Sequence, residues 1–218
     1  PKTQKTELFI VPSLGGPSKK ILEVGSTARW RPDGERIGYI YRRKDNHGRS
    51  GRLEFWSIKP DGGDNRLEFI DSTSTVRGRI SVAWSADGKS VAWIRTFPEG
   101  HQEVIVHELE SGKERQITFD KKNIDEVFWT SHDEIVFSST KTGSSNLWII
   151  PASGGQAVQL TKGSGPDIAM KVSADGKKLL YLQQQLVGHI CTQAGCNPLS
   201  TLSTQKVHFS TTPSWCFW

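Results

Sequence analysis

The chain has 218 residues, of which 35% are hydrophobic, and its formal net charge is +5. No stretch reaches the roughly 18 consecutive apolar residues of a membrane-spanning helix, so we expect no membrane insertion, and we recognise no signal peptide. The content of 21 glycines, 10 prolines and 8 tryptophans favours short strands joined by frequent tight turns.

Strands are predicted along most of the chain, in groups that the turn residues separate. Residues 7–24 predict two strands around the pair Gly15 and Gly16. Residues 26–70, 78–118 and 124–161 each predict four strands, and residues 167–185 predict two more. No segment shows a sustained 3.6-residue apolar period, so we expect almost no helix.

The groups are copies of one repeat. A turn block reads WRPDG at residues 30–34, WSADG at 84–88 and VSADG at 172–176, with a degenerate copy, WTSHD, at 129–133. Successive copies begin 54, 45 and 43 residues apart, close to the roughly 40–45 residues of a four-stranded propeller blade. Each block precedes an alternating strand with an aromatic residue in the same position, and two copies close with QIT at 116–118 and QLT at 159–161.

These blocks, together with LWIIP at residues 147–151 and its following Gly154 and Gly155, resemble the WD-like repeat of TolB-type propellers over roughly residues 7–188. The resemblance implies an all-β fold, a β-propeller of four-stranded blades with about three whole blades plus two half-blades. The half-blades either complete one another in a small closed ring or belong to a larger ring, which we favour because the family usually has six to eight blades. First strands are expected near Ala28, Val82, Val127 and Met170. The resemblance also implies a periplasmic or otherwise extracytoplasmic location.

The repeat domain is expected to span residues 1–188, and residues 189–218 form a tail without the repeat. All three cysteines, Cys191, Cys196 and Cys216, lie in this tail. It is either a native extension or the product of translation out of frame, and we favour the second. We expect it to contribute little to the fold, because it has no repeat strand to pair with. The set His189, Cys191, Cys196 and His208 lacks the spacing of a zinc framework, so we predict no metal site.

Catalytic motifs are not recognisable in the chain. It contains no G-x-S-x-G, H-E-x-x-H or G-x-x-x-x-G-K-[ST] pattern, so we expect no enzymatic activity and no cofactor. Asp33, Asp87 and Asp175 could form a ring of carboxylates, but each precedes a glycine in a turn where aspartate bonds its own backbone. Trp30, Trp84 and Trp129 are expected to pack between blades rather than to form an exposed ligand platform.

One local charge anomaly remains, in the longest repeat interval. Residues 42–52 read RRKDNHGRSGR, with five cations against one aspartate and one histidine. We expect a loop outside the blade ladders, and arginine forks there suit the carboxylates of an acidic peptide or protein. The alternative is a solvated loop without a partner. The candidate partner-binding residues are Arg42, Arg43, Lys44, Arg49 and Arg52.

The expected function is therefore a non-enzymatic protein- or peptide-binding propeller module, part of a larger bacterial protein. The alternative is the substrate-gating propeller of a prolyl-oligopeptidase- or tricorn-like serine peptidase without its hydrolase domain. A nucleic-acid partner is not expected, because one basic loop is not a basic face. The sequence indicates no particular small-molecule ligand.

Overall fold

The computed structural model describes residues 6–24, 27–44, 50–73, 80–163, 165–173, 177–184, 191–192, 195–196 and 206–211. Regular structure in these residues is entirely β, and none of them forms a helix. The prediction of an all-β chain with short strands is therefore confirmed for this part of the molecule.

Three whole blades occupy the middle of the chain, each an antiparallel sheet whose four strands are paired in chain order. The first blade contains β3 (Ala28–Trp30), β4 (Ile37–Lys44), β5 (Ser50–Ile58) and β6 (Arg66–Asp71). The second contains β7 (Val82–Trp84), β8 (Ser90–Thr96), β9 (Gln102–Glu108) and β10 (Glu114–Gln116). The third contains β11 (Val127–Trp129), β12 (Glu134–Thr142), β13 (Ser144–Pro151) and β14 (Val158–Gln159).

Smaller sheets stand on either side of these blades. The N-terminal sheet pairs β1 (Thr6–Ile10) with β2 (Lys19–Val24). The C-terminal sheet has the order β15 (Asp167–Val172), β16 (Lys178–Gln183) and β19 (Lys206–Thr211). A separate pair joins β17 (Cys191–Thr192) to β18 (Gly195–Cys196).

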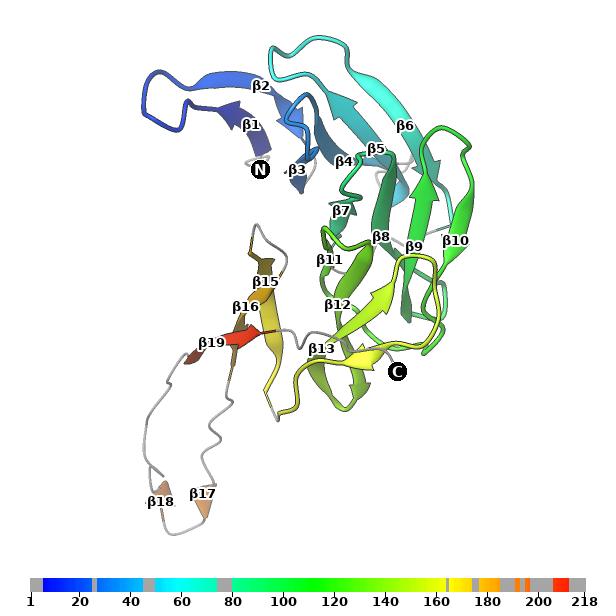
Figure 1. Ribbon diagram of the computed structural model, residues 1–218, viewed down its shortest axis with the longest axis vertical. Coiled ribbons are helices and arrows are strands. Elements are labelled where there is room, and N and C mark those ends of the chain that lie inside the picture. Colours follow the sequence, from blue (N-terminus) through cyan, green and yellow to red (C-terminus); the bar gives the residue numbers. More distant parts are fainter. Residues whose placement is uncertain are drawn as a thin grey trace.

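The sheets follow one another in an arc, with β3, β7, β11 and β15 on its inner side and β6 and β10 on its outer side (Figure 1). The terminal sheets β1–β2 and β15–β16–β19 are separate sheets, so the two half-blades do not complete one another. Three blades turn the chain through only part of a circle, which keeps these two sheets apart. The structure thus has the open arrangement and not the small closed ring.

The tail differs from its expected role at one strand. We expected residues 189–218 to have no strand to pair with, but β19 pairs antiparallel with β16 from Lys178 opposite Thr211 to Gln183 opposite Lys206. The edge of β16 is open because the last repeat has only two strands of its own, and an open edge offers backbone groups to any extended segment. Residues 167–185 supply two strands as expected, but the tail adds a third to their sheet, so the expectation that the tail has no strand to pair with is wrong.

The first strand of each whole blade begins where the repeat predicts, at Ala28, Val82 and Val127. In the last sheet, β15 begins at Asp167 and not near Met170, and its pairing with β16 is irregular after Ile168. The irregularity adds residues to β15 before the turn block, so the repeat spacing places its start too late.

The Asp-Gly blocks form tight turns that the aspartates stabilise. Asp33 Oδ1 accepts a hydrogen bond from the Glu35 amide, and Asp87 Oδ1 accepts one from the Lys89 amide, both at 3.0 Å. The following glycine has a left-handed φ, as at Gly88 with +69°. These two carboxylates are therefore committed to their own turns, while Asp175 lies outside the described residues.

The QIT and QLT blocks form the same set of hydrogen bonds at the ends of the second and third blades. In each, the glutamine amide bonds the threonine carbonyl, and the threonine hydroxyl accepts the amide of the neighbouring third strand. The distances are 2.8 Å for Gln116 to Thr118, 2.8 Å for Gln159 to Thr161, 2.8 Å for Val104 to Thr118 and 2.9 Å for Leu147 to Thr161. The repeated letters thus encode one repeated set of hydrogen bonds.

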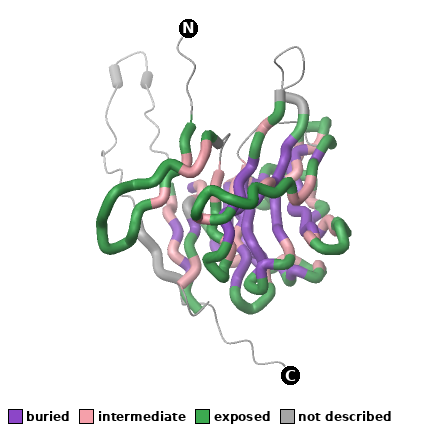
Figure 2. Tube along the Cα trace, turned by 90° about the horizontal axis from the view of Figure 1, so that it is seen from above, coloured by how far each residue is buried: buried purple, intermediate pink, exposed green. Residues whose placement is uncertain are grey.

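The core lies between neighbouring sheets. Buried residues are concentrated in the whole blades, whereas none of the described residues of the N-terminal hairpin is buried (Figure 2). Trp84 packs on the preceding blade, with its ring centroid 5.4 Å from that of Phe55. Trp84 and Trp129 are 6% and 7% exposed, as expected for tryptophans between blades.

Trp30 differs from these two tryptophans, because it is 51% exposed. It occupies the same position in its turn block, but the sheet before it contains only β1 and β2. Trp84 lies against Gly38 on the second strand of the preceding blade, and the two-stranded N-terminal sheet lacks the first two strands of a blade. The expectation that Trp30 packs between blades is therefore wrong in this arc.

Polar contacts also connect the inner strands of successive blades. In each case the residue just before an inner strand bonds the backbone of the next inner strand or of the residues just before it. These contacts are Thr27 Oγ1 to the Ile80 carbonyl at 2.9 Å, the Val127 amide to Ser81 Oγ at 3.1 Å and the Met170 amide to Glu126 Oε2 at 3.2 Å. Each blade is thereby fastened to the next along the inner side of the arc.

Candidate functional site

The basic segment forms the end of the β4–β5 hairpin. Arg42, Arg43 and Lys44 are the last residues of β4, and Arg52 belongs to β5, where it pairs with Arg43. The expectation of a loop outside the ladders is therefore wrong for these four residues, because strands with exposed faces tolerate long charged side chains. Arg49 and the side chain of Lys44 lie outside the described residues.

Glu54 organises the cations on one face of this hairpin. Its side chain is 1% exposed, and its Oε1 accepts hydrogen bonds from Arg43 Nε at 2.6 Å and Arg52 Nε at 2.9 Å. Its Oε2 accepts from Arg43 Nη2 at 3.2 Å and from the Trp56 indole at 3.0 Å. The arginine side chains remain 52% and 44% exposed, so both guanidinium groups stay accessible to a partner.

The hydrogen bond from Arg43 is the main cause that lowers the pKa of Glu54 from 4.5 to about 2, against the opposing effect of burial. The indole of Trp56 and the guanidinium of Arg52 lower it further. The same contact with Glu54 raises the pKa of Arg43. Two cations thus share one permanent anion, which fixes their positions and leaves one net positive charge.

The hairpin divides the predicted cations between its two faces. Strand alternation places Tyr41 and Arg43 on one face, where the Arg43 guanidinium carbon lies 5.8 Å from the Tyr41 ring centroid. Arg42 points to the opposite face, and its burial lowers its pKa. We call Tyr41, Arg43, Arg52 and Glu54 the hairpin surface. The sequence pattern located these cations, but it did not identify Glu54 as the residue that holds two of them.

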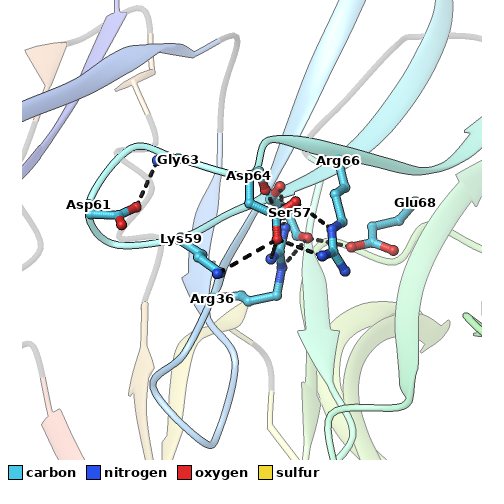
Figure 3. A network of polar contacts seen from close by, with 8 residues as sticks. All are labelled: Arg36, Ser57, Lys59, Asp61, Gly63, Asp64, Arg66 and Glu68. Atoms are coloured by element: carbon cyan, nitrogen blue, oxygen red, sulfur yellow. Dashed lines mark hydrogen bonds and ion pairs between the residues drawn. The ribbon is translucent and has the colours of Figure 1, made fainter.

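A second charged cluster lies at the other end of the same blade (Figure 3). Arg36 is 6% exposed and donates to Asp64 Oδ2 at 3.0 Å and to Ser57 Oγ at 2.7 Å. Arg66 binds the same carboxylate at 2.6 Å, and its hydrogen bond is the main cause that lowers the pKa of Asp64. These charges satisfy one another and fasten the β5–β6 turn, so we read this cluster as structural.

The inner strands line a cavity of about 250 Å³ that the repeat pattern did not indicate. It combines the exposed ring of Trp30 with charged residues of three different strands or strand ends. These charged residues are Arg29, Glu126 and Lys171. A sequence signal existed, since each of them lies within three residues of a tryptophan or methionine predicted on an inner strand.

The expectations of no metal site and no membrane insertion can be compared with the described residues only. Among the described residues, no three histidine, cysteine, aspartate or glutamate side chains are grouped as metal ligands. Cys191 and Cys196 are paired through their backbones in β17 and β18, and His189 lies outside the described residues. Nor do the described segments include a helix long and apolar enough to cross a bilayer.

Four-stranded antiparallel sheets that follow one another in an arc and pack face to face define the class of β-propellers. The chain belongs to a particular family within that class, the TolB beta propeller domain, whose model matches residues 34–189. The resemblance drawn from the turn blocks is therefore confirmed.

Relatives with different names share this propeller. Dipeptidyl-peptidase 5 of Porphyromonas gingivalis is 30% identical over 150 residues, which cover 62% of this chain and 20% of that protein. The Protein TolB homolog of Chlorobium chlorochromatii is 26% identical over 135 residues, which cover 62% of this chain and 29% of that protein. The chain thus spans less than a third of either relative.

Among solved structures, TolB from Acinetobacter baumannii superposes with a TM-score of 0.70 at 20% identity. The match covers 94% of this chain and 46% of that one. At this identity the likeness shows the fold alone.

Proposed function

We propose that this propeller segment binds a protein or peptide partner without catalysing a reaction, and that an acidic segment of the partner contacts the hairpin surface. The observation that carries the proposal is the arrangement of Arg43 and Arg52. Both are held by the buried Glu54 and both remain about half exposed. Guanidinium groups that are already ordered lose little conformational freedom when they bind a carboxylate. They should therefore bind it more tightly than the arginines of a mobile loop would.

The proposal is tested with a synthetic peptide of five consecutive glutamates and a matched glutamine peptide. We expect the glutamate peptide to bind, and the binding to weaken as salt rises, because exposed charges are screened beyond about 8 Å at physiological ionic strength. The variant Arg43→Glu with Arg52→Glu should lose this binding. A double reversal at the exposed residues Lys89 and Lys113, of equal charge change, serves as the control.

Equal binding by the hairpin variant and the control would overturn the assignment to this surface. Equal affinity for the glutamate and glutamine peptides would show that charge does not drive the binding. Both measurements use calorimetry on the purified chain, with circular dichroism to verify that each variant is folded.

A specific observation favours a second function, the substrate-gating propeller of a peptidase. The relative that is 30% identical is a dipeptidyl peptidase, of which this chain matches 20%. A serine hydrolase domain with a G-x-S-x-G segment in the same open reading frame would decide for this function. In either case we propose that this chain itself is not the catalyst. Stoichiometric labelling of the purified chain by a fluorophosphonate probe would contradict that.

A further inference from the structure

The second blade carries a cavity of about 480 Å³ beside its β8–β9 hairpin. The hairpin loop forms one wall, and the segment after β10 forms the other. The lining residues are Phe97, Glu99, His101, Glu103, Gln116, Phe119 and Lys121. In a blade the second-to-third-strand hairpin opens on one end of the sheet, so this cavity lies at the same end of its blade as the hairpin surface does in the first blade.

Aromatic rings form much of this cavity. The rings of Phe97 and His101 are stacked, with centroids 4.7 Å apart and planes inclined by 6°. Phe119 is 71% exposed, an unusual position for a phenylalanine whose neighbours Ile117 and Thr118 are buried. The open Phe119 ring suits a cation or another flat group better than an aliphatic chain.

A buried carboxylate lies in the same lining. Glu103 is 1% exposed, its Oε2 accepts the Thr118 hydroxyl at 2.5 Å and its Oε1 accepts the Lys121 amide at 2.7 Å. Both hydrogen bonds come from neutral donors, and within the described part of the chain no cation forms an ion pair with Glu103. A buried charge of this kind is costly unless a partner offsets it. Glu99, whose side chain is 71% exposed, adds a second carboxylate, with one oxygen 3.9 Å from His101 Nδ1. Lys121 also lines the cavity, so two carboxylates stand against one lysine.

The walls of the cavity are fixed by hydrogen bonds. The Gln102 amide donates to the Lys122 carbonyl at 2.9 Å, and the Ile124 amide donates to Gln102 Oε1 at 3.0 Å. Together with the bond from Lys121 to Glu103, these contacts hold the segment after β10 against the β8–β9 hairpin. The backbone on both sides of the cavity and the Glu103 carboxylate are therefore held in place before a ligand arrives.

We propose that this cavity binds the cationic end of an arginine side chain from a partner peptide. The guanidinium plane stacks on the Phe119 and Phe97 rings, and its charge is met by Glu103 and Glu99. Arginine fits better than lysine because its planar group can stack and donate to a carboxylate at once. Glu103 accepts with both carboxylate oxygens, where a glutamine would offer only one acceptor oxygen, but neither donor is a cation, so these contacts leave its negative charge without an ion-paired partner among the described residues.

This site is independent of the proposed function at the hairpin surface, because the two sites prefer ligands of opposite charge and lie on different blades. Binding of the glutamate peptide tests the hairpin surface, and binding of acetyl-arginine amide tests the cavity. Failure of either one leaves the other intact.

The test is a titration of the isotope-labelled chain with acetyl-arginine amide, followed by nuclear magnetic resonance, with acetyl-citrulline amide as the neutral isostere. We expect shifts at the amides of residues 97–103 and 116–121 with arginine and none with citrulline. Phe119→Ala should weaken the arginine affinity about tenfold, since cation–π contacts in partly desolvated sites are worth that much. Glu99→Gln should weaken it by a smaller factor.

The control is Phe9→Ala, which removes a phenylalanine that is 50% exposed and distant in the fold, and it should leave the affinity unchanged. Glu103→Gln removes the buried charge while keeping an acceptor, and should abolish binding if the variant folds. Phe119→Ala and Glu99→Gln decide the matter if it does not. Equal shifts with citrulline, or an unchanged affinity in Phe119→Ala, would overturn the proposal.

Discussion

At the scale of single residues, Gly38 shows how closely the blades approach. A Cβ atom at this position would lie 2.6 Å from a ring carbon of Trp84 and 2.7 Å from a ring carbon of Phe55. Both neighbours are buried aromatic side chains, so neither can move aside without disturbing the contact between the first and second blades. Gly38 is needed here for space, whereas the turn glycines are needed for their positive φ.

We therefore expect Gly38→Ala to destabilise the chain by about 1–3 kcal/mol, the usual range for overpacking a core. Urea denaturation of the purified protein measures the change. Adding Trp84→Leu should recover part of the loss, because it removes the ring that the new methyl group meets, and the double-mutant cycle isolates this coupling. An unchanged midpoint in Gly38→Ala would show that the blades are farther apart than described.

Glu54 gives a second prediction at this scale, concerning pH. Its pKa is lowered from 4.5 to about 2, so the folded state binds this proton less readily than the unfolded state does. The resulting stability is fully present above about pH 4.5 and is lost as the pH falls toward 2. Because both arginines are about half exposed, we expect only about 1–2 kcal/mol, less than the full shift implies.

The measurement compares urea denaturation at neutral pH and near pH 3 for the chain and for Glu54→Gln. The variant should lose less stability on acidification, because it has no carboxylate to protonate at this site. Glu110→Gln, at an exposed residue, serves as the control and should behave like the unchanged chain. Identical acid profiles for all three proteins would refute the role of the Arg43 contact.

At the scale of elements, the repeat blocks predicted the strands well because their information is local. An aspartate that bonds its own turn and a glycine with positive φ position a hairpin without help from distant residues, so Ala28, Val82 and Val127 begin strands as predicted. The hairpin surface could not be predicted so fully. Which face Arg43 occupies depends on how far the β4–β5 ladder continues, and its pairing with Glu54 depends on that register.

The C-terminal sheet gives a prediction at this scale. In the described residues β19 pairs with β16 alone, and β16 keeps β15 on its other edge. Truncation after Ile190 should therefore leave the melting temperature of the whole blades nearly unchanged. The amides of β16 that face β19 should exchange their hydrogens faster, because their partners are gone.

Hydrogen exchange read out by mass spectrometry distinguishes the two effects, with peptides from β8 and β12 as internal controls. A fall of many degrees in the melting temperature would mean that the tail supports more than one sheet. Unchanged exchange in β16 would mean that β19 does not occupy its edge in solution.

At the scale of the whole molecule, the arc is a series of similar interfaces that stops at each end. The second and third blades each bury a tryptophan, Trp84 or Trp129, and the residue before each inner strand fastens the following sheet. Such a repeat gains stability from each neighbour it covers. Trp30 and Trp84 occupy the same position in their own copies of the turn block, so their local conformation is alike. What differs at the N-terminal end is the stabilisation gained from packing on a neighbouring sheet.

This difference can be measured by comparing Trp30→Ala with Trp84→Ala. Trp84 is 6% exposed, and its removal should cost about 3–5 kcal/mol, as for other buried aromatic residues. Trp30 is 51% exposed, so its removal should cost less than about 1 kcal/mol. Acrylamide should readily quench one component of the tryptophan fluorescence of the unchanged chain, and Trp30→Phe should remove that component. If Trp30→Ala were as costly as Trp84→Ala, or if quenching fell as the protein concentration rose, another surface would be covering Trp30 and the arc would not be open at this end in solution.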